Sequence, residues 1–294
     1  MRLQGIFVPV ATPFNYDGEI YPAKVEHNVA KWNKTGLAGY VVCGLTGESV
    51  LLAANERWRM LELTAKHASS EKLLLCGTGA ESVRETVRQI NAAAELGYRA
   101  AVVSAPRFYP HLLHTAASLA LYYGAVADQA RVPVIIDNSP AAAGADLTAE
   151  AVAQLSAHPN IVAISEGSGD VAKLARMIAE ARAGFQVLAG SARTLADAFA
   201  AGAVGAILDY ANAAPYSTIA IWEAHRQRES DAAQDWQRRI APAAELVSEK
   251  YGIPGLKHAM DLNGYYGGPV RLPLTGLGPQ ARREIEEAFR DLKG

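Results

Sequence analysis

The chain has 294 residues, of which 50% are hydrophobic and 20% are charged, with a formal net charge of −2. This composition is typical of a globular protein and lacks the excess of basic residues on which binding to nucleic acid depends. The length allows one large domain, because α/β barrels often extend to about 200–250 residues.

The first residues and the cysteines predict the compartment. Residues 1–14 (MRLQGIFVPVATPF) lack the pattern of a signal peptide, and no apolar run reaches the roughly 18 residues that a membrane helix needs. Cys43 and Cys76 lie on predicted strands without the CxxC or histidine spacing of a metal or redox site. We therefore expect a cytoplasmic protein with reduced cysteines, no resident metal and no cofactor.

Eight apolar segments of strand length recur along the chain. They cover residues 6–12, 40–44, 73–79, 100–106, 132–138, 160–165, 185–190 and 204–210. Segments with helical period separate them, and those at 81–97 and 171–184 end on a glycine, as helices often do. Continuous apolar strands that alternate with helices indicate a parallel sheet, and eight units predict a closed (β/α)8 TIM barrel.

An open, doubly wound sheet is the main alternative fold. No GxGxxG follows the first predicted strand and no GxxxxGK[ST] occurs, so the phosphate-binding signatures of that alternative are missing. We expect residues 1–214 to form the barrel. Residues 215–294 read as further helices, which we expect to pack on the barrel as one structural unit.

Polar residues gather at the carboxyl ends of the predicted strands, where barrel proteins build their sites. Asp137 ends the fifth strand, Ser165 ends the sixth and Asp209 lies at the end of the eighth, which makes them the candidate catalytic residues. The candidate substrate-binding residues are Gly44, Leu45, Thr46, Gly47, Glu48, Phe108, Tyr109, Gly190 and Ser191. Backbone amides in the segments 44–49 and 190–192 could hold a carboxylate whatever the side chains are.

Eight segments of the chain are similar to the motifs of a known protein family. They are GIFVPVATPFNYDGEI (5–20), GLTGES (44–49), GTGAES (77–82), DNSPAAAG (137–144), EGSGD (166–170), LAGSA (188–192), ANAAP (211–215) and RLPL (271–274). With these motifs the chain resembles, over nearly its whole length, the aldolase and lyase barrels typified by dihydrodipicolinate synthase and N-acetylneuraminate lyase. The resemblance implies a lyase with a small oxo or hydroxy acid at the strand ends, assembled as a homo-oligomer, either a dimer or a homotetramer.

The resemblance also implies that the reactive lysine is missing. The family pattern has a lysine at the end of strand six, and this chain has Ser165 there. An amine forms an iminium that withdraws electrons, whereas a hydroxyl stops at a hemiketal, so serine cannot replace it. Lys173 and Lys257, the nearest other candidates, lie on predicted helices. We expect this divergent member to have lost Schiff-base chemistry.

At other positions, too, this chain lacks the reactive residue of the family pattern. The tyrosine that ends strand five falls at Asp137, and a hydroxyl of its proton relay falls at Leu45, although Thr46 matches. A second family tyrosine falls at Phe108, beside Tyr109. The arginine of the synthases falls near Ala142, which leaves no cation for a dicarboxylate.

Three hypotheses stay open for such a site. A carboxylate at a strand end is costly unless it is solvated, paired or used, and Asp137 with Asp209 or Glu48 could form an acid/base pair for lyase or hydratase chemistry. Alternatively, the aspartates cap helices or accept backbone N–H bonds in a non-catalytic binding or structural protein. The third hypothesis is a family lyase that still forms the imine with its substrate. A Mg²⁺ site of the three carboxylates, and a role for His111 or His114, have weaker support.

Overall fold

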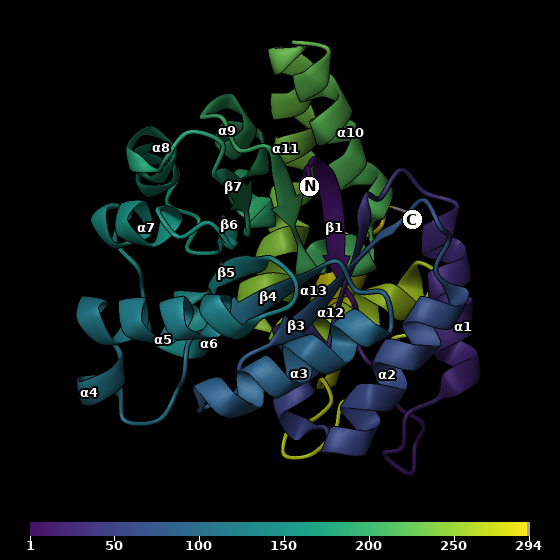
Figure 1. Cartoon of the computed structure of the whole chain (residues 1–294). Coiled ribbons are helices and arrows are strands. Elements are labelled where there is room, and N and C mark those ends of the chain that lie inside the picture. The colour runs from purple at the N-terminus through teal and green to yellow at the C-terminus, as the bar shows by residue number, and fades with distance from the viewer. Residues whose placement is uncertain (293–294) are drawn as a thin grey trace.

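Eight short parallel strands close into a barrel in chain order in the computed structural model, which describes residues 1–292 (Figure 1). The strands are β1 (Gly5–Pro9), β2 (Gly39–Val42), β3 (Leu73–Thr78), β4 (Ala100–Ser104), β5 (Val134–Asn138), β6 (Ile161–Glu166), β7 (Gln186–Ala189) and β8 (Gly205–Ile207). Each lies within a predicted strand or overlaps it closely. The predicted (β/α)8 TIM barrel is confirmed.

Helices connect successive strands and cover the outside of the barrel (Figure 1). They are α1 (Pro22–Asn33), α2 (Ala54–His67), α3 (Val83–Glu95), α4 (Pro110–Leu113), α5 (Ala116–Gln129), α6 (Pro140–Ala143), α7 (Ala149–Ser156), α8 (Val171–Glu180) and α9 (Leu195–Ala200). Side-chain caps fix where several begin: Ser82 accepts the amide of Glu85 at the start of α3, and Asp170 accepts that of Lys173 at the start of α8.

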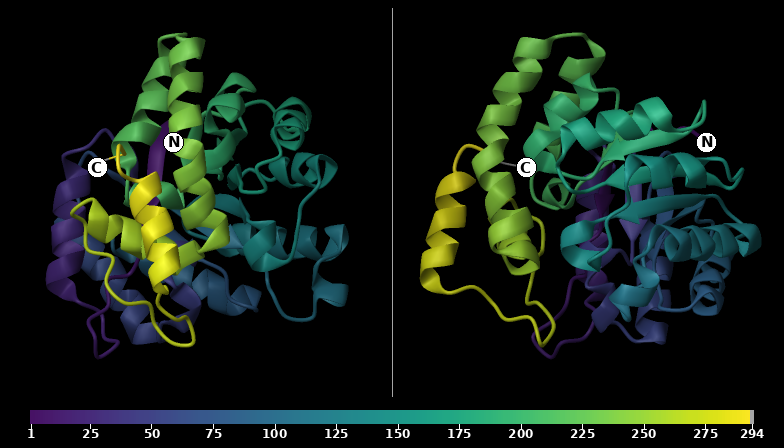
Figure 2. Two further views of the ribbon diagram at one scale, coloured as in Figure 1. Left: turned by 180° about the vertical axis from the view of Figure 1, so that it is seen from behind. Right: turned by 90° about the vertical axis from the view of Figure 1, so that its left-hand side faces the viewer.

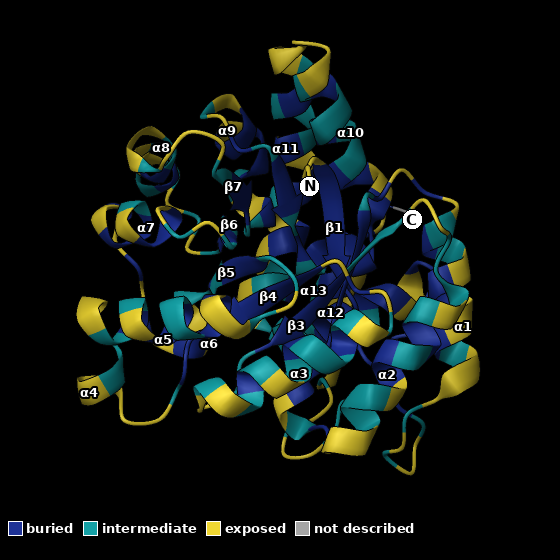
Figure 3. Ribbon diagram, viewed as in Figure 1, coloured by how far each residue is buried: buried dark blue, intermediate teal, exposed yellow. Residues whose placement is uncertain are grey.

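The strands separate two apolar regions. Figure 3 shows that the strands themselves are mostly buried. Side chains such as Ile6 and Val8 face the helices and belong to the larger region. Alternate side chains such as Phe7 and Ile135 form a smaller cluster, which lies inside the barrel because successive residues of a strand point to opposite faces. The barrel is thus a packed core, and a site must lie above it, at the strand ends.

Four further helices follow the last strand and lie together on one side of the barrel (Figure 2). They are α10 (Pro215–Arg226), α11 (Ser230–Glu245), α12 (Gly252–Leu262) and α13 (Pro279–Ala288). Pro242 lies inside α11, and a π-helical turn at Leu246–Lys250 joins α11 to α12. The helix expected to run to residue 294 ends at Ala288, and residues 293–294 lie outside the described part.

Within residues 1–292, no helix combines the length and the apolar character that crossing a membrane requires.

Candidate active site

A cavity of about 900 Å³ opens at the carboxyl ends of the barrel strands. Eight of the predicted site residues line it. They are Gly44, Leu45, Thr46, Asp137, Ser165, Gly190, Ser191 and Asp209. The other four predicted residues, Gly47, Glu48, Phe108 and Tyr109, are not part of its wall.

Strand alternation explains why three polar side chains reach the cavity. Ile135, Ala163 and Ile207 face the inside of the barrel. Asp137, Ser165 and Asp209 follow them by two positions and therefore share their face. The apolar interior thus ends in a ring that carries two carboxyl groups and a hydroxyl.

Asp137 is held by two serine hydroxyls. Ser104 Oγ donates to Asp137 Oδ2 at 2.7 Å, and Ser139 Oγ donates to Asp137 Oδ1 at 2.6 Å. The first bond follows from the register of the barrel, in which Ser104 of β4 pairs with Asp137 of β5. The carboxyl group is therefore fixed in orientation at the cavity wall.

Asp209 has a different environment. The cavity reaches its side chain, which is otherwise surrounded by protein, and this burial raises the pKa of the Asp209 carboxyl. Hydrogen bonds from Ser248 Oγ at 2.8 Å and from the Tyr210 amide at 2.6 Å oppose part of the rise in pKa. The Asp209 carboxyl therefore keeps its proton to a higher pH than an exposed aspartate does.

Ser165 pairs with Asp137 of β5 on one side and with Leu188 of β7 on the other, and it lines the cavity. Its hydroxyl can therefore donate a hydrogen bond to, or accept one from, a ligand in the cavity.

Glu48 and Lys257 form a buried ion pair away from the cavity. Lys257 Nζ lies 2.6 Å from Glu48 Oε1, and neither side chain is more than 1% exposed. Burial lowers the pKa of Lys257, and the Glu48 carboxylate opposes this effect. Glu48 is therefore not the third carboxylate of the mouth, because it is engaged elsewhere.

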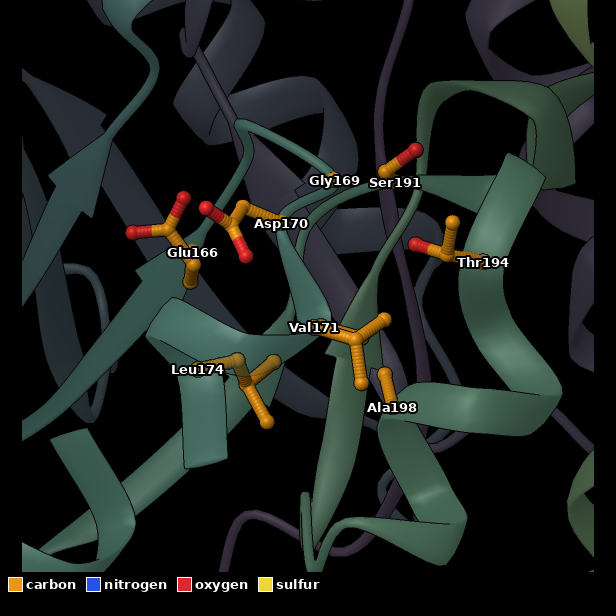
Figure 4. A pocket seen from close by; sticks show the side chains of 9 residues that line it. Glu166, Gly169, Asp170, Val171, Leu174, Ser191, Thr194 and Ala198 are labelled. Atoms are coloured by element: carbon orange, nitrogen blue, oxygen red, sulfur yellow. The ribbon is translucent and has the colours of Figure 1, made fainter. Parts of the chain in front are cut away.

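The other candidate lysine is also paired. Lys173 lies 3.2 Å from Glu166 Oε2 and contacts the Asp146 carboxylate. Glu166 in turn accepts hydrogen bonds from Asn138 Nδ2 and the Ser168 amide. Glu166 and Asp170 line a second, very small cavity of about 10 Å³ (Figure 4), which has room for about one water molecule.

The loop after β4 places its aromatic residues outside the cavity. Phe108 is 67% exposed and Tyr109 is 66% exposed. His114 Nε2 lies 2.8 Å from the carbonyl oxygen of Pro106. Neither His114 nor His111 lines the cavity. Phe108 and Tyr109, which we predicted to bind substrate, thus lie outside the cavity wall, and their role in binding stays a prediction.

Arg107 and Ser248 are among the polar cavity residues that the sequence analysis did not single out. Arg107 lies in the same loop as Phe108 and brings a cation to the wall. Ser248 comes from the π-helical turn after α11, so its position depends on how the C-terminal helices pack. No local sequence pattern marks it.

Within the described part of the chain, no three His, Cys, Asp or Glu side chains come together in a group that could hold a metal ion. Of the three carboxylates considered for Mg²⁺, only Asp137 and Asp209 line the cavity.

The fold and the place of the cavity define an α/β-barrel protein with its candidate site at the carboxyl ends of the strands. The sequence matches the Dihydrodipicolinate synthetase family over residues 2–292, and the chain belongs to that family.

Relatives and solved structures agree with this membership. The chain is 31% identical to a 4-hydroxy-tetrahydrodipicolinate synthase of Exiguobacterium sp., over 97% of this chain and 96% of the relative. It is 32% identical to a probable mitochondrial 4-hydroxy-2-oxoglutarate aldolase of Emericella nidulans, over 98% and 94%. A prophage protein of the dihydrodipicolinic acid synthase family from E. coli K12, solved in complex with pyruvate, superimposes with a TM-score of 0.91 at 26% identity, and the match covers 98% of each chain.

Proposed function

We propose that this protein is a lyase that acts on a small oxo or hydroxy acid at the barrel mouth by acid/base chemistry, without a Schiff base. The observation that carries the proposal is Ser165 at the end of β6, in a cavity whose described wall contains no lysine. The two lysines considered as substitutes are ion-paired with Glu48 and Glu166. Family membership supports the lyase class, and the pyruvate complex of the E. coli relative supports the type of ligand.

The proton transfers are assigned to the two aspartates. In its ionised form, Asp137 removes a proton from the carbon next to the substrate carbonyl, and the electron pair of that C–H bond forms an enol. The carbonyl oxygen receives a proton from the carboxylic acid of Asp209, whose raised pKa supports this role. In a dehydration, the protonated Asp137 then gives its proton to the hydroxyl on the following carbon, which leaves as water, while the enol O–H returns its proton to Asp209 and the carbonyl re-forms beside a new C=C bond. In a carbon–carbon cleavage, Asp137 instead removes the proton of that hydroxyl, an aldehyde is released, and the electron pair of the broken bond forms the enol, whose oxygen takes the proton of Asp209.

A non-catalytic binding protein is the second candidate. One observation favours it: both oxygens of Asp137 already accept serine hydroxyls, as expected of a carboxylate with a purely structural role. The experiments below separate the two candidates.

The absence of imine chemistry is tested by borohydride reduction in the presence of pyruvate, followed by mass spectrometry of the intact protein and its peptides. The expected result is no covalent mass increase. A reduced pyruvyl group on Lys173 or Lys257 would instead identify the Schiff-base lysine and contradict the proposal.

The acid/base assignment is tested on a substrate found by screening oxo and hydroxy acids for turnover. Asp137→Asn and Asp209→Asn should each reduce kcat about 100-fold or more while the ligand Kd changes little. Asp128→Asn, which changes a carboxylate that is 72% exposed, is the matched control and should retain full activity. If no acid of the screen is turned over but several bind, the binding protein is the better description.

We also propose a cytoplasmic homo-oligomer, a dimer or a tetramer. Cys43 and Cys76 are both free and buried, which suits a reducing compartment. Sedimentation of the purified protein measures the assembly state directly.

A further inference from the structure

Arg107 is the single cation of the described cavity wall, and the proposed mechanism gives it no role. Arg107 lines the wall, and its Nε atom is buried without a hydrogen-bond partner in the described part of the chain. The hydrogen bond that Arg107 does make is through its backbone N–H, to Glu81 Oε2. A buried donor without a partner costs free energy, so an unpaired guanidinium beside a cavity calls for a ligand.

The loop that carries Arg107 is held on both sides. Glu81 Oε2 accepts the amides of Arg107 and Phe108 at 2.9 and 3.0 Å. The Pro106 carbonyl lies 2.8 Å from His114 Nε2. The arginine is therefore presented to the cavity by an ordered backbone.

The carboxylates of the cavity wall already have partners of their own. Asp137 accepts two serine hydroxyls, and Asp209 accepts Ser248 Oγ and the Tyr210 amide. Glu249 pairs with Arg193. Arg107 is ion-paired with none of them and stays available to an anion from solution.

We propose that Arg107 binds the carboxylate of the substrate and makes the site selective for monocarboxylic acids. A guanidinium offers two parallel N–H donors that match the two oxygens of a carboxylate. Because Arg107 is the single cation of the described wall, a second carboxylate on the ligand would have no cation to pair with and would lie in a cavity that also contains the Asp137 carboxylate, so a second negative charge is disfavoured. The identity of the ligand as an oxo or hydroxy acid rests on the proposed function, whereas the role of Arg107 concerns binding alone.

The test is calorimetric titration of the parent protein, Arg107→Ala and Arg107→Lys with pyruvate, D-glycerate, 2-oxoglutarate and the neutral analogue pyruvamide. We expect Arg107→Ala to weaken pyruvate or glycerate binding about 10–100-fold and to leave pyruvamide binding unchanged. Arg107→Lys should lose less, because it keeps the charge but not the paired donors. The parent should bind 2-oxoglutarate more weakly than pyruvate.

Arg131→Ala is the matched control, because Arg131 is an exposed arginine that pairs with Glu95. Circular dichroism checks that each variant is folded. Equal affinity of the parent and Arg107→Ala for pyruvate and glycerate, or no binding of any acid by the parent, overturns the inference. If Asp137→Asn abolishes turnover while Arg107→Ala binds normally, the proposed function stands and the carboxylate binds elsewhere, for example at the amides of residues 44–49. If acid binding depends on Arg107 but no acid is turned over, the role of Arg107 stands and the proposed lyase activity fails.

Discussion

Lys257 Nζ and Glu48 Oε1 lie 2.6 Å apart in a region where neither side chain is more than 1% exposed. Glu48 Oε2 also accepts the amide of Arg271, and Lys257 donates to the Pro269 carbonyl. The pair therefore joins three parts of the chain: the segment after β2, helix α12, and the stretch before α13. Because residues 44–46 line the cavity, the ion pair fixes one wall of the candidate site.

Removing one partner of this pair should be strongly destabilising. Lys257→Met leaves the Glu48 carboxylate buried without its ion partner, and we expect a loss of about 3–5 kcal/mol in the free energy of unfolding. The double variant Lys257→Met/Glu48→Gln should recover part of the loss, because no charge is then left buried. Urea denaturation measures both, with Arg131→Ala as an exposed control that should cost about 0–1 kcal/mol. Equal losses in Lys257→Met and Arg131→Ala would show that the pair does not matter.

The pH dependence of stability should report the raised pKa of Asp209. An unfolded aspartate ionises near its ordinary pKa of 3.8, whereas the folded Asp209 stays protonated to higher pH. Between these two pKa values the folded state binds more protons than the unfolded state, so stability falls as pH rises. Asp209→Asn removes the titrating group and keeps an oxygen that can accept from Ser248.

We therefore expect Asp209→Asn to gain stability over the parent as pH rises through this window, with no gain below pH 3.8 and a constant gain above the folded pKa. Urea midpoints at a series of pH values from 4 to 8 measure the difference. A gain that is the same at every pH would mean that the substitution acts through packing and not through ionisation.

Asn212 should be a structural residue of the mouth. It is fully buried, accepts the Ala11 amide at 3.0 Å, and donates to the carbonyls of Pro9 and Asp209 at 2.9 and 2.8 Å. Asn212→Ala leaves these groups without partners and should cost about 3 kcal/mol in the free energy of unfolding. Asn91→Ala is the control, because Asn91 also bonds to backbone groups but at an exposed position, and it should cost less than about 1 kcal/mol. Similar costs at the two positions would exclude a special role for Asn212.

The sequence predicted those parts of the molecule that depend on local pattern. Apolar runs marked the eight strands, and the polar residues that end these runs include Asp137 and Asp209, which both line the cavity. The partners of the charged groups could not be predicted in the same way. Glu48 meets Lys257 only because α12 packs against the barrel, and Ser248 reaches Asp209 only because of the turn after α11. Such contacts depend on tertiary packing between segments that are distant in sequence.

Arg107 shows a second limit. The sequence analysis selected the neighbouring Phe108 and Tyr109 as candidate substrate-binding residues, whereas Arg107 lines the cavity and both aromatic side chains are mostly exposed. Sequence position alone does not predict which of three neighbouring side chains a loop directs inward, because loop backbones lack the fixed periodicity of strands.

Restoring an amine at the end of β6 should restore imine formation. In Ser165→Lys the new side chain projects into a cavity of about 900 Å³, so it can be accommodated without displacing the core. We expect borohydride reduction with pyruvate to attach a reduced pyruvyl group at position 165, where the parent gives no adduct. Because the nearby Asp137 carboxylate favours the charged amine, trapping should be more efficient at pH 9 than at pH 7.

Lys173→Met in the same background is the control, and it should leave the adduct in place because Lys173 pairs with Glu166 away from the main cavity. A folded Ser165→Lys variant that forms no adduct at either pH would mean that the mouth does not bring pyruvate to the end of β6.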